Sequence, residues 1–198
     1  MTPRPDRRHA LASLLALVGA AGLAPIVRAQ ASFDLAQLMQ LLAQVKAGEA
    51  VFTEKRTVAM LERTLESSGK LSFEAPDTFV RETLKPRHER LAVVGNVVTM
   101  SLGSRSRTVP LDSVPEAAVI VEAIRGTLTG NGEAIERNFS ASVTGNAVRW
   151  TLELVPRVPR LRELVSSVRV SGEQALVREV TVAMADGDRS VMRIAPPG

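Results

Sequence analysis

The sequence predicts a mainly β, α+β fold in which one curved antiparallel sheet of about eleven strands forms an incomplete barrel covered by helices. Two stretches carry apolar residues at helical spacing, which indicates amphipathic helices. A series of shorter segments alternates with a period of two, and most of them are joined by turns too short for the crossover that parallel strands need. A sheet of that size must curl, and the apolar faces of the helices must lie on it.

The first predicted element is a helix. Ser32 can cap its start, and Gly48 ends it. Its apolar stripe consists of Leu35, Leu38, Met39, Leu42 and Val45.

Strands are predicted next. Their ranges are Ala50–Glu62, Lys70–Ala75, Thr78–Leu84, Glu89–Val94, Val97–Leu102 and Arg105–Val109. The breaks between them are Ser67-Ser68-Gly69, Pro76-Asp77, Lys85-Pro86, Gly95-Asn96 and Gly103-Ser104. Such residues favour tight turns, so we expect neighbouring strands to pair as hairpins.

The middle of the chain is predicted to be helical again. Ser113 and Glu116 have the spacing of a capping box, and Pro115 is tolerated in a first turn. The apolar stripe consists of Ala117, Ile120, Val121, Ile124 and Leu128. Thr129-Gly130-Asn131-Gly132 ends this helix, and a short helical piece is predicted from Glu133 to Arg137.

The pattern then returns to strands. Their predicted ranges are Phe139–Val143, Ala147–Val155, Val165–Val170, Leu176–Met184 and Ser190–Ile194. Gly145-Asn146 and Asp186-Gly187 are hairpin turns, and Arg157–Arg162 is predicted as a short amphipathic crossover.

The N-terminus has the layout of a secretory signal peptide. Arg4, Arg7 and Arg8 precede an apolar run, 11–27, and Val27-Arg28-Ala29 supplies a small-residue cleavage site. We expect cleavage after Ala29, which divides the chain into a signal peptide, 1–29, and one exported domain, 30–198. The alternatives are a permanent membrane anchor, for which about 17 apolar residues is marginal, and a twin-arginine export signal.

The composition excludes several kinds of functional site. The 198 residues include no cysteine, which excludes disulfides, zinc-thiolate sites, cysteine nucleophiles and lipid attachment at cysteine. The net charge is +4, but the signal peptide holds four arginines and one aspartate, so the domain carries about +1 and no nucleic-acid partner is expected. His88 is the domain's only histidine and no Gly-x-Ser-x-Gly motif occurs, so we expect no enzymatic activity, no catalytic residue, no metal and no cofactor. We also expect the domain to be a monomer.

Several short motifs resemble the outer-membrane lipoprotein carrier family, LolA. In the N-terminal half they are Phe52-Thr53-Glu54-Lys55, Ser68-Gly69-Lys70-Leu71-Ser72-Phe73, Ala75-Pro76-Asp77-Thr78-Phe79, Pro86 and Gly95. Asp188-Arg189-Ser190 is similar to the family's Gln-Arg-Ser segment, and the helix from Glu116 falls where the family has a helix under the sheet.

The resemblance implies a periplasmic carrier. Its incomplete barrel, with helices as a lid, would hold the acyl chains of a lipoprotein or other lipid-like cargo between an inner-membrane transporter and an outer-membrane acceptor. Exposing an acyl chain to water costs about 0.8 kcal/mol per methylene, so such a cargo needs an apolar shelter. The alternative is a periplasmic sensing or regulatory module on the same scaffold that binds a membrane-protein partner.

The chain departs from the family at the lid. Ala75 occupies the position where the family's carriers have a latch arginine before the proline. Arg81, two residues after Phe79, occupies the position where the family has an aromatic residue. The latch is therefore missing or relocated, and Arg81 and Arg189 are the candidates. The alternatives are a solvated strand residue for Arg81, and for Arg189 an ion pair that stabilises the turn with Asp186 or Asp188.

Apolar residues at strand or helix spacing are the candidates for lining the cavity. They are Phe52, Leu71, Phe73, Phe79, Met100, Ile120, Ile124, Trp150, Leu152 and Met184. The same spacing is typical of ordinary core residues.

Overall fold

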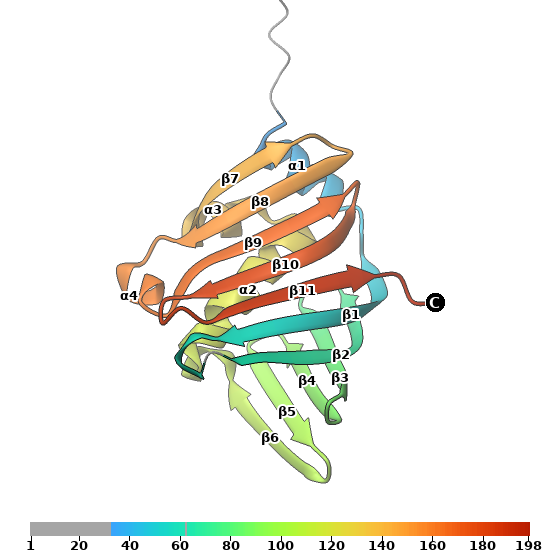
Figure 1. The fold of residues 1–198 in the computed structure, drawn as a ribbon. Helices are drawn as coiled ribbons and strands as arrows, with labels where there is room; N and C mark the ends of the chain where they lie inside the picture. Colours follow the sequence, from blue (N-terminus) through green and yellow to red (C-terminus); the bar gives the residue numbers. More distant parts are fainter. Residues whose placement is uncertain (1–32, 62) are drawn as a thin grey trace, which may run out of the picture. The chain divides into compact units, whose positions relative to one another are not determined.

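The structure, a computed structural model, describes residues 33–61 and 63–198. The predicted signal peptide and the predicted cap Ser32 lie outside these residues. Within them the chain forms eleven strands and four α-helices, which confirms the predicted fold class (Figure 1).

The strands form one antiparallel sheet in the order β6-β5-β4-β3-β2-β1-β11-β10-β9-β8-β7. Their ranges are β1 Ala47–Val58, β2 Arg63–Glu74, β3 Thr78–Lys85, β4 Glu89–Val94, β5 Val97–Leu102, β6 Arg105–Pro110, β7 Phe139–Gly145, β8 Arg149–Pro156, β9 Val165–Glu173, β10 Leu176–Met184 and β11 Arg189–Ala195. Because β6 and β7 are the two edges, the sheet is not closed.

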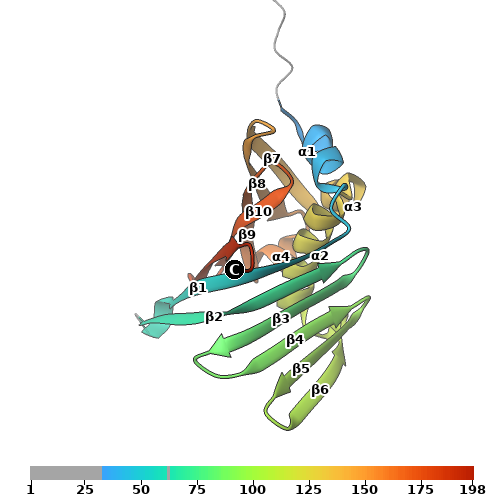
Figure 2. The same cartoon turned by 90° about the vertical axis from the view of Figure 1, so that its right-hand side faces the viewer.

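Two hairpin meanders make up this sheet, one from β1 to β6 and one from β7 to β11. They are joined where β1 pairs with β11, with Val51 opposite Ala195 and Thr57 opposite Arg189. Helices α2 (Pro115–Thr129) and α3 (Gly132–Asn138) connect β6 to β7. The helices lie on the inner side of the bent sheet, so one face of each meander is turned toward them (Figure 2).

Helix α1 spans Leu35–Leu42 and is capped by Asp34. Asp34 accepts a hydrogen bond from the Gln37 backbone, and the Gln37 side chain accepts one from the Asp34 backbone, so the start is a capping box. The prediction that the helix runs on to Gly48 was wrong, because β1 begins at Ala47 and its pairing with β2 places Gly48 inside a strand.

The predicted boundaries of the first two strands were also wrong. β1 ends at Val58 and a short 3-10 turn, Ala59–Leu61, follows, whereas β2 begins at Arg63 and runs through the predicted break at Ser67-Ser68-Gly69. Gly69 lies opposite a bulge in β3, where a Cβ would come within 1.9 Å of the Glu82 carbonyl oxygen. The glycine therefore permits a close approach of two strands rather than a turn.

The capping box predicted for α2 does not form. A 3-10 turn, Leu111–Ser113, precedes the helix, so Val114 occupies the cap position and the Ser113 hydroxyl donates to the Pro110 carbonyl at 2.6 Å. The predicted helix end is confirmed, because Gly130 adopts φ 65° as the C-cap of α2. The short helix α4, Pro159–Arg162, lies within the predicted crossover.

The core consists of two apolar clusters, both on the inner face. The larger one joins α1, α2 and α3 to β7–β10, and its buried members are Leu38, Met39, Leu42, Val119, Ala123, Ile135, Phe139, Trp150, Leu152, Leu154, Val165, Val168, Val170, Val180 and Val182. The smaller one lies between α2 and β3–β6, and its buried members are Val93, Val98 and Leu111. The helices thus cover the β7–β10 half of the sheet more fully than the β1–β6 half.

Candidate functional site

Side chains on the inner face of β2–β6 form three rows that run across the strands. The row nearest α2 is apolar, contributes to the smaller cluster, and consists of Phe73, Phe79, Val93, Val98 and Val109. We call the next two the middle row and the outer row. The middle row consists of Leu71, Arg81, Leu91, Met100 and Arg107. The outer row consists of Gly69, Thr83, Glu89, Leu102 and Arg105.

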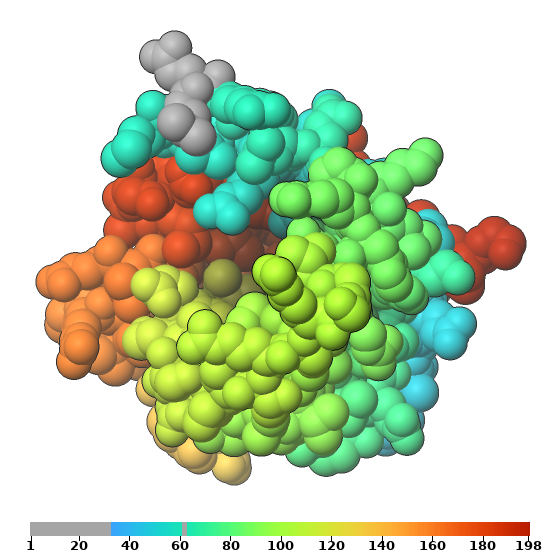
Figure 3. Space-filling model, turned by 90° about the horizontal axis from the view of Figure 1, so that it is seen from below, coloured from blue at the N-terminus to red at the C-terminus, as the bar shows by residue number. Residues whose placement is uncertain are grey.

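Apart from Leu71 and Gly69, the residues of the middle and outer rows line an open hollow of about 580 Å³, to which Glu54 and Arg56 of β1 also contribute. Seen from below, the surface is hollowed between the β1–β2 segment and the β5–β6 hairpin (Figure 3). Three apolar side chains of the lining are partly exposed: Leu91 by 36%, Met100 by 40% and Leu102 by 48%. A volume of this size is within the range of small-molecule sites, so we treat the hollow as the candidate ligand site.

The hollow is rich in positive charge. Its lining includes the arginines Arg56, Arg81, Arg90, Arg105 and Arg107, and the acids Glu54 and Glu89. Within residues 33–61 and 63–198, the ion pairs of these arginines are Arg56 with Asp188 and Arg81 with Glu54. The remaining arginines, Arg90, Arg105 and Arg107, outnumber the remaining acid, Glu89, so the hollow keeps an excess of positive charge beside the apolar side chains.

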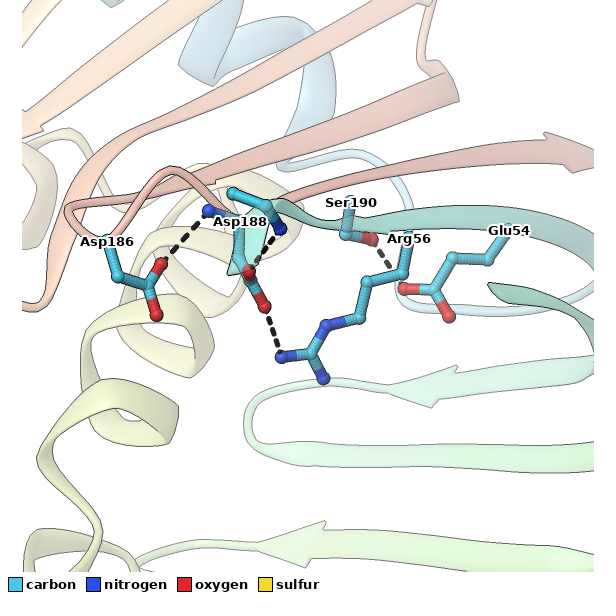
Figure 4. Close-up of polar contacts among 6 residues, drawn as sticks. Glu54, Arg56, Asp186, Asp188 and Ser190 are labelled. Atoms are coloured by element: carbon cyan, nitrogen blue, oxygen red, sulfur yellow. Dashed lines mark hydrogen bonds and ion pairs between the residues drawn. The ribbon is translucent and has the colours of Figure 1, made fainter. Parts of the chain in front are cut away.

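Glu54 is the centre of a half-buried polar network. Its carboxylate accepts hydrogen bonds from the Ser190 hydroxyl at 2.5 Å and the Ser67 hydroxyl at 3.0 Å, and it forms an ion pair with Arg81 (Figure 4 shows the Ser190 contact). Burial by itself raises the pKa of Glu54, but these hydrogen bonds and the Arg81 charge outweigh it and hold the pKa below its ordinary value. Because the Arg81 guanidinium also lies 4.8 Å from the Phe52 ring centroid, its position is fixed from two sides.

A second network joins the end of β1 to the β10–β11 turn. Asp188 accepts from the Arg56 guanidinium at 2.9 Å and from the Ala59 backbone at 3.0 Å, and the Asp188 backbone donates to Asp186 (Figure 4). The hydrogen bond from Arg56 is the main reason that the pKa of Asp188 lies below its ordinary value. The interpretation of Arg189 as an ion-pair partner of Asp186 or Asp188 was wrong. Arg56, brought in by the β1–β11 pairing, pairs with Asp188, and within the described residues Arg189 forms an ion pair with neither aspartate.

An arginine on α2 ties this helix to the sheet. The Arg125 guanidinium donates to the Gly95 carbonyl in the β4–β5 turn at 2.5 Å and pairs with Glu122 at 2.6 Å. The contact joins the helix to the β1–β6 meander. The sequence pattern did not single out Arg125, and a latch role for Arg81 or Arg189 stays a prediction.

The structure places the predicted cavity residues in three settings. Met100 and Arg81 line the hollow. Trp150 and Leu152 are fully buried in the larger cluster, against which Ile120 and Met184 pack. The others are Phe52, buried beneath Arg81, and the half-buried Leu71, Phe73, Phe79 and Ile124. Their contact with a ligand stays a prediction.

Sequence reasoning missed Leu91, Leu102, Arg105 and Arg107. A signal for them was available, because the turns Gly95-Asn96 and Gly103-Ser104 fix the register of β4, β5 and β6. Counting outward from those turns aligns these four side chains and Met100 on one face.

Comparisons with known proteins find a matching family model and several similar solved structures. A family model described as outer membrane lipoprotein carrier protein LolA-like matches residues 27–195. None of the curated proteins matches the sequence. In the described part of the chain, no helix is long and apolar enough to span a bilayer, and no group of His, Cys, Asp and Glu is arranged to hold a metal.

Solved structures similar to this chain include the LolA superfamily protein NE2245 from Nitrosomonas europaea, at 7% identity and a TM-score of 0.40, covering 81% of this chain and 92% of that one. A putative outer membrane lipoprotein-sorting protein domain from Vibrio parahaemolyticus matches at 8% identity and a TM-score of 0.45, over 82% and 89% of the two chains. LprF from Mycobacterium bovis matches at 9% identity and a TM-score of 0.37, over 81% and 91%.

Proposed function

Because the chain belongs to the outer membrane lipoprotein carrier protein LolA-like family, we propose that it is a periplasmic carrier that holds the acyl chains of a lipoprotein or other lipid-like molecule in the hollow during transport to the outer membrane. In this proposal, residues 1–29 are an export signal cleaved after Ala29, and residues 30–198 form the carrier domain. An inner-membrane transporter loads the carrier and an outer-membrane acceptor unloads it. The chain acts by binding and catalyses no reaction.

The observation that carries the proposal is the set of partly exposed apolar side chains in the hollow. Leu91, Met100 and Leu102 lie next to one another across β4 and β5 and face inward, beside the row that α2 covers. An acyl chain laid over them would remove both its own surface and theirs from water, which is favourable by about 0.8 kcal/mol per methylene buried.

The packing of the helices also favours the middle and outer rows as the place where the ligand binds. The larger cluster already fills the inner face of β7–β10 with side chains, including the fully buried Trp150 and Leu152. Arg125 holds α2 to the β4–β5 turn. A ligand on the middle and outer rows would need neither the opening of that core nor the release of α2.

Substituting Met100 tests this placement. We expect Met100→Gln to weaken the binding of a fluorescent fatty-acid probe about fivefold, because a polar amide would replace an apolar contact worth about 1 kcal/mol. Binding is measured by titration of the probe against the purified domain.

Val97→Gln is the matched control. Val97 lies on the same strand, is 43% exposed against 40% for Met100, and faces the opposite side of the sheet. Its substitution should leave the affinity unchanged. Equal losses in both variants would place the probe elsewhere, and a wild-type domain that takes up no probe would contradict the carrier proposal and favour the regulatory module.

A further inference from the structure

Two arginines stand at the open edge of the hollow. Arg105 and Arg107 belong to the edge strand β6, where Arg105 lies opposite Leu102 and Arg107 lies opposite Met100. At its β6 end, each of the two rows therefore places a guanidinium next to an apolar side chain. In the described residues, neither arginine takes part in an ion pair.

We propose that Arg105 and Arg107 bind the anionic group, a phosphate or carboxylate, of an amphiphile whose alkyl chain lies on Leu91, Met100 and Leu102. This inference rests on the proposed function and specifies the class of cargo: one with a negative charge at the end of its chain.

The spacing of the two arginines suits one anionic group. Residues two apart on a strand face the same side, with Cα atoms roughly 7 Å apart, so two long guanidinium side chains can converge on one group. A guanidinium offers paired donors that match the oxygens of a phosphate or carboxylate. The stems of both arginines lie beside apolar residues, which is where the head group of a chain lying on those residues would emerge.

The other charges of the hollow do not serve this role. Arg56 and Arg81 are already paired with Asp188 and Glu54, whose pKa values lie below the ordinary range. Glu89 shares the outer row with Arg105, but Leu102 lies between them. Arg90 also lines the hollow, but it alternates with Glu89 and Leu91 along β4 and belongs to neither row. In the middle and outer rows, the arginines without an ion pair in the described residues are thus Arg105 and Arg107.

Edge strands also carry charged residues that prevent pairing with other sheets. That role explains a charge on β6 but predicts no preference among ligands. The two explanations therefore differ in whether the charge of the head group changes the affinity.

The test compares amphiphiles that have the same chain and different head groups. Dodecyl phosphate, dodecyl maltoside and dodecyltrimethylammonium are titrated below their micelle concentrations, and inorganic phosphate is titrated alone. The proteins are the wild-type domain, Arg105→Gln/Arg107→Gln, and the control Arg149→Gln/Arg193→Gln. The control removes the same charge from side chains that are 82% and 75% exposed on the outer face.

We expect the wild type and the control to bind dodecyl phosphate roughly tenfold more tightly than dodecyl maltoside, and Arg105→Gln/Arg107→Gln to lose that preference while its affinity for the maltoside is unchanged. Melting curves check that both double variants fold.

Equal affinities of the wild type for the three head groups, or an equal loss of preference in the control, would overturn this inference and leave the carrier proposal standing. If inorganic phosphate binds as tightly as dodecyl phosphate, the two arginines bind a free anion and not an amphiphile, which would also overturn this inference. If no dodecyl compound binds the wild type, the carrier proposal itself fails.

Discussion

Replacing Glu54 by leucine is expected to lower the free energy of unfolding by about 3 kcal/mol at pH 7, because removal of one partner leaves a partly buried charge without compensation. The Glu54 side chain is 12% exposed and accepts from Ser67, Ser190 and Arg81. Arg81 itself is 32% exposed, and among the described residues its buried Nε has no hydrogen-bond partner. The substitution would thus leave the Arg81 guanidinium over the Phe52 ring without its ion-pair partner.

The effect of Glu54→Leu should depend on pH. The pKa of Glu54 in the folded state lies below its ordinary value of 4.5, so its stabilising contribution is fully present above about 4.5 and is lost as the pH falls through the folded pKa. Urea unfolding followed at several pH values therefore gives a difference between wild type and variant that is largest at neutral pH and shrinks in acid.

Glu66→Leu is the control for this measurement. Glu66 of β2 forms an ion pair with Lys55 of β1, and the two side chains are 69% and 68% exposed. An exposed pair contributes about 0.5 kcal/mol. A loss of the same size in both variants, or a difference for Glu54→Leu that stays constant with pH, would contradict the role assigned to Glu54.

Replacing Trp150 by alanine is expected to lower the free energy of unfolding by about 4 kcal/mol, the usual cost of removing a large aromatic side chain from a core. Trp150 is 1% exposed, and its indole donates to the Gln174 carbonyl at 2.8 Å. The ring packs against Gly172, where a Cβ would come within 2.4 Å of the indole. The ring is therefore closely packed on the side that faces Gly172.

Chemical denaturation measures the cost of Trp150→Ala, and Val148→Ala is the control because Val148 is 67% exposed in the preceding turn. We expect the control to change stability by less than about 0.5 kcal/mol. Trp150→Phe provides a milder variant that retains a ring. The affinity for the fatty-acid probe should be unchanged in any folded variant at Trp150; a weaker affinity with unchanged stability would instead support the prediction that Trp150 contacts the ligand.

Much of the sheet could be predicted from the sequence because its signals are local. The turns Gly95-Asn96 and Gly103-Ser104 and the alternation on either side of them define β4, β5 and β6 within a residue or two. The end of β1 could not be predicted in this way. Its bounds are set by a ladder with β2 and by pairing with β11, a strand more than a hundred residues away.

The candidate site was harder to predict than the fold. Trp150 and Met100 both satisfy the pattern of an inward-facing strand residue, and only the positions of the helices decide which of them is covered. The partners of Glu54 show the same limit, because Ser190 is separated from it by 136 positions in the chain. A sequence pattern identifies the face of a strand, but the tertiary arrangement determines which part of that face stays open.

The most direct test of the central claim is to locate a bound acyl chain. A fatty acid that carries a photoreactive diazirine near the end of its chain is bound to the domain, irradiated, and mapped by peptide mass spectrometry. The account predicts labelling on β4 and β5, at Leu91, Met100 or Leu102, with strong reduction by excess unlabelled fatty acid. Competed labelling confined to the α1–α3 and β7–β10 core, or to the outer face of the sheet, would contradict it.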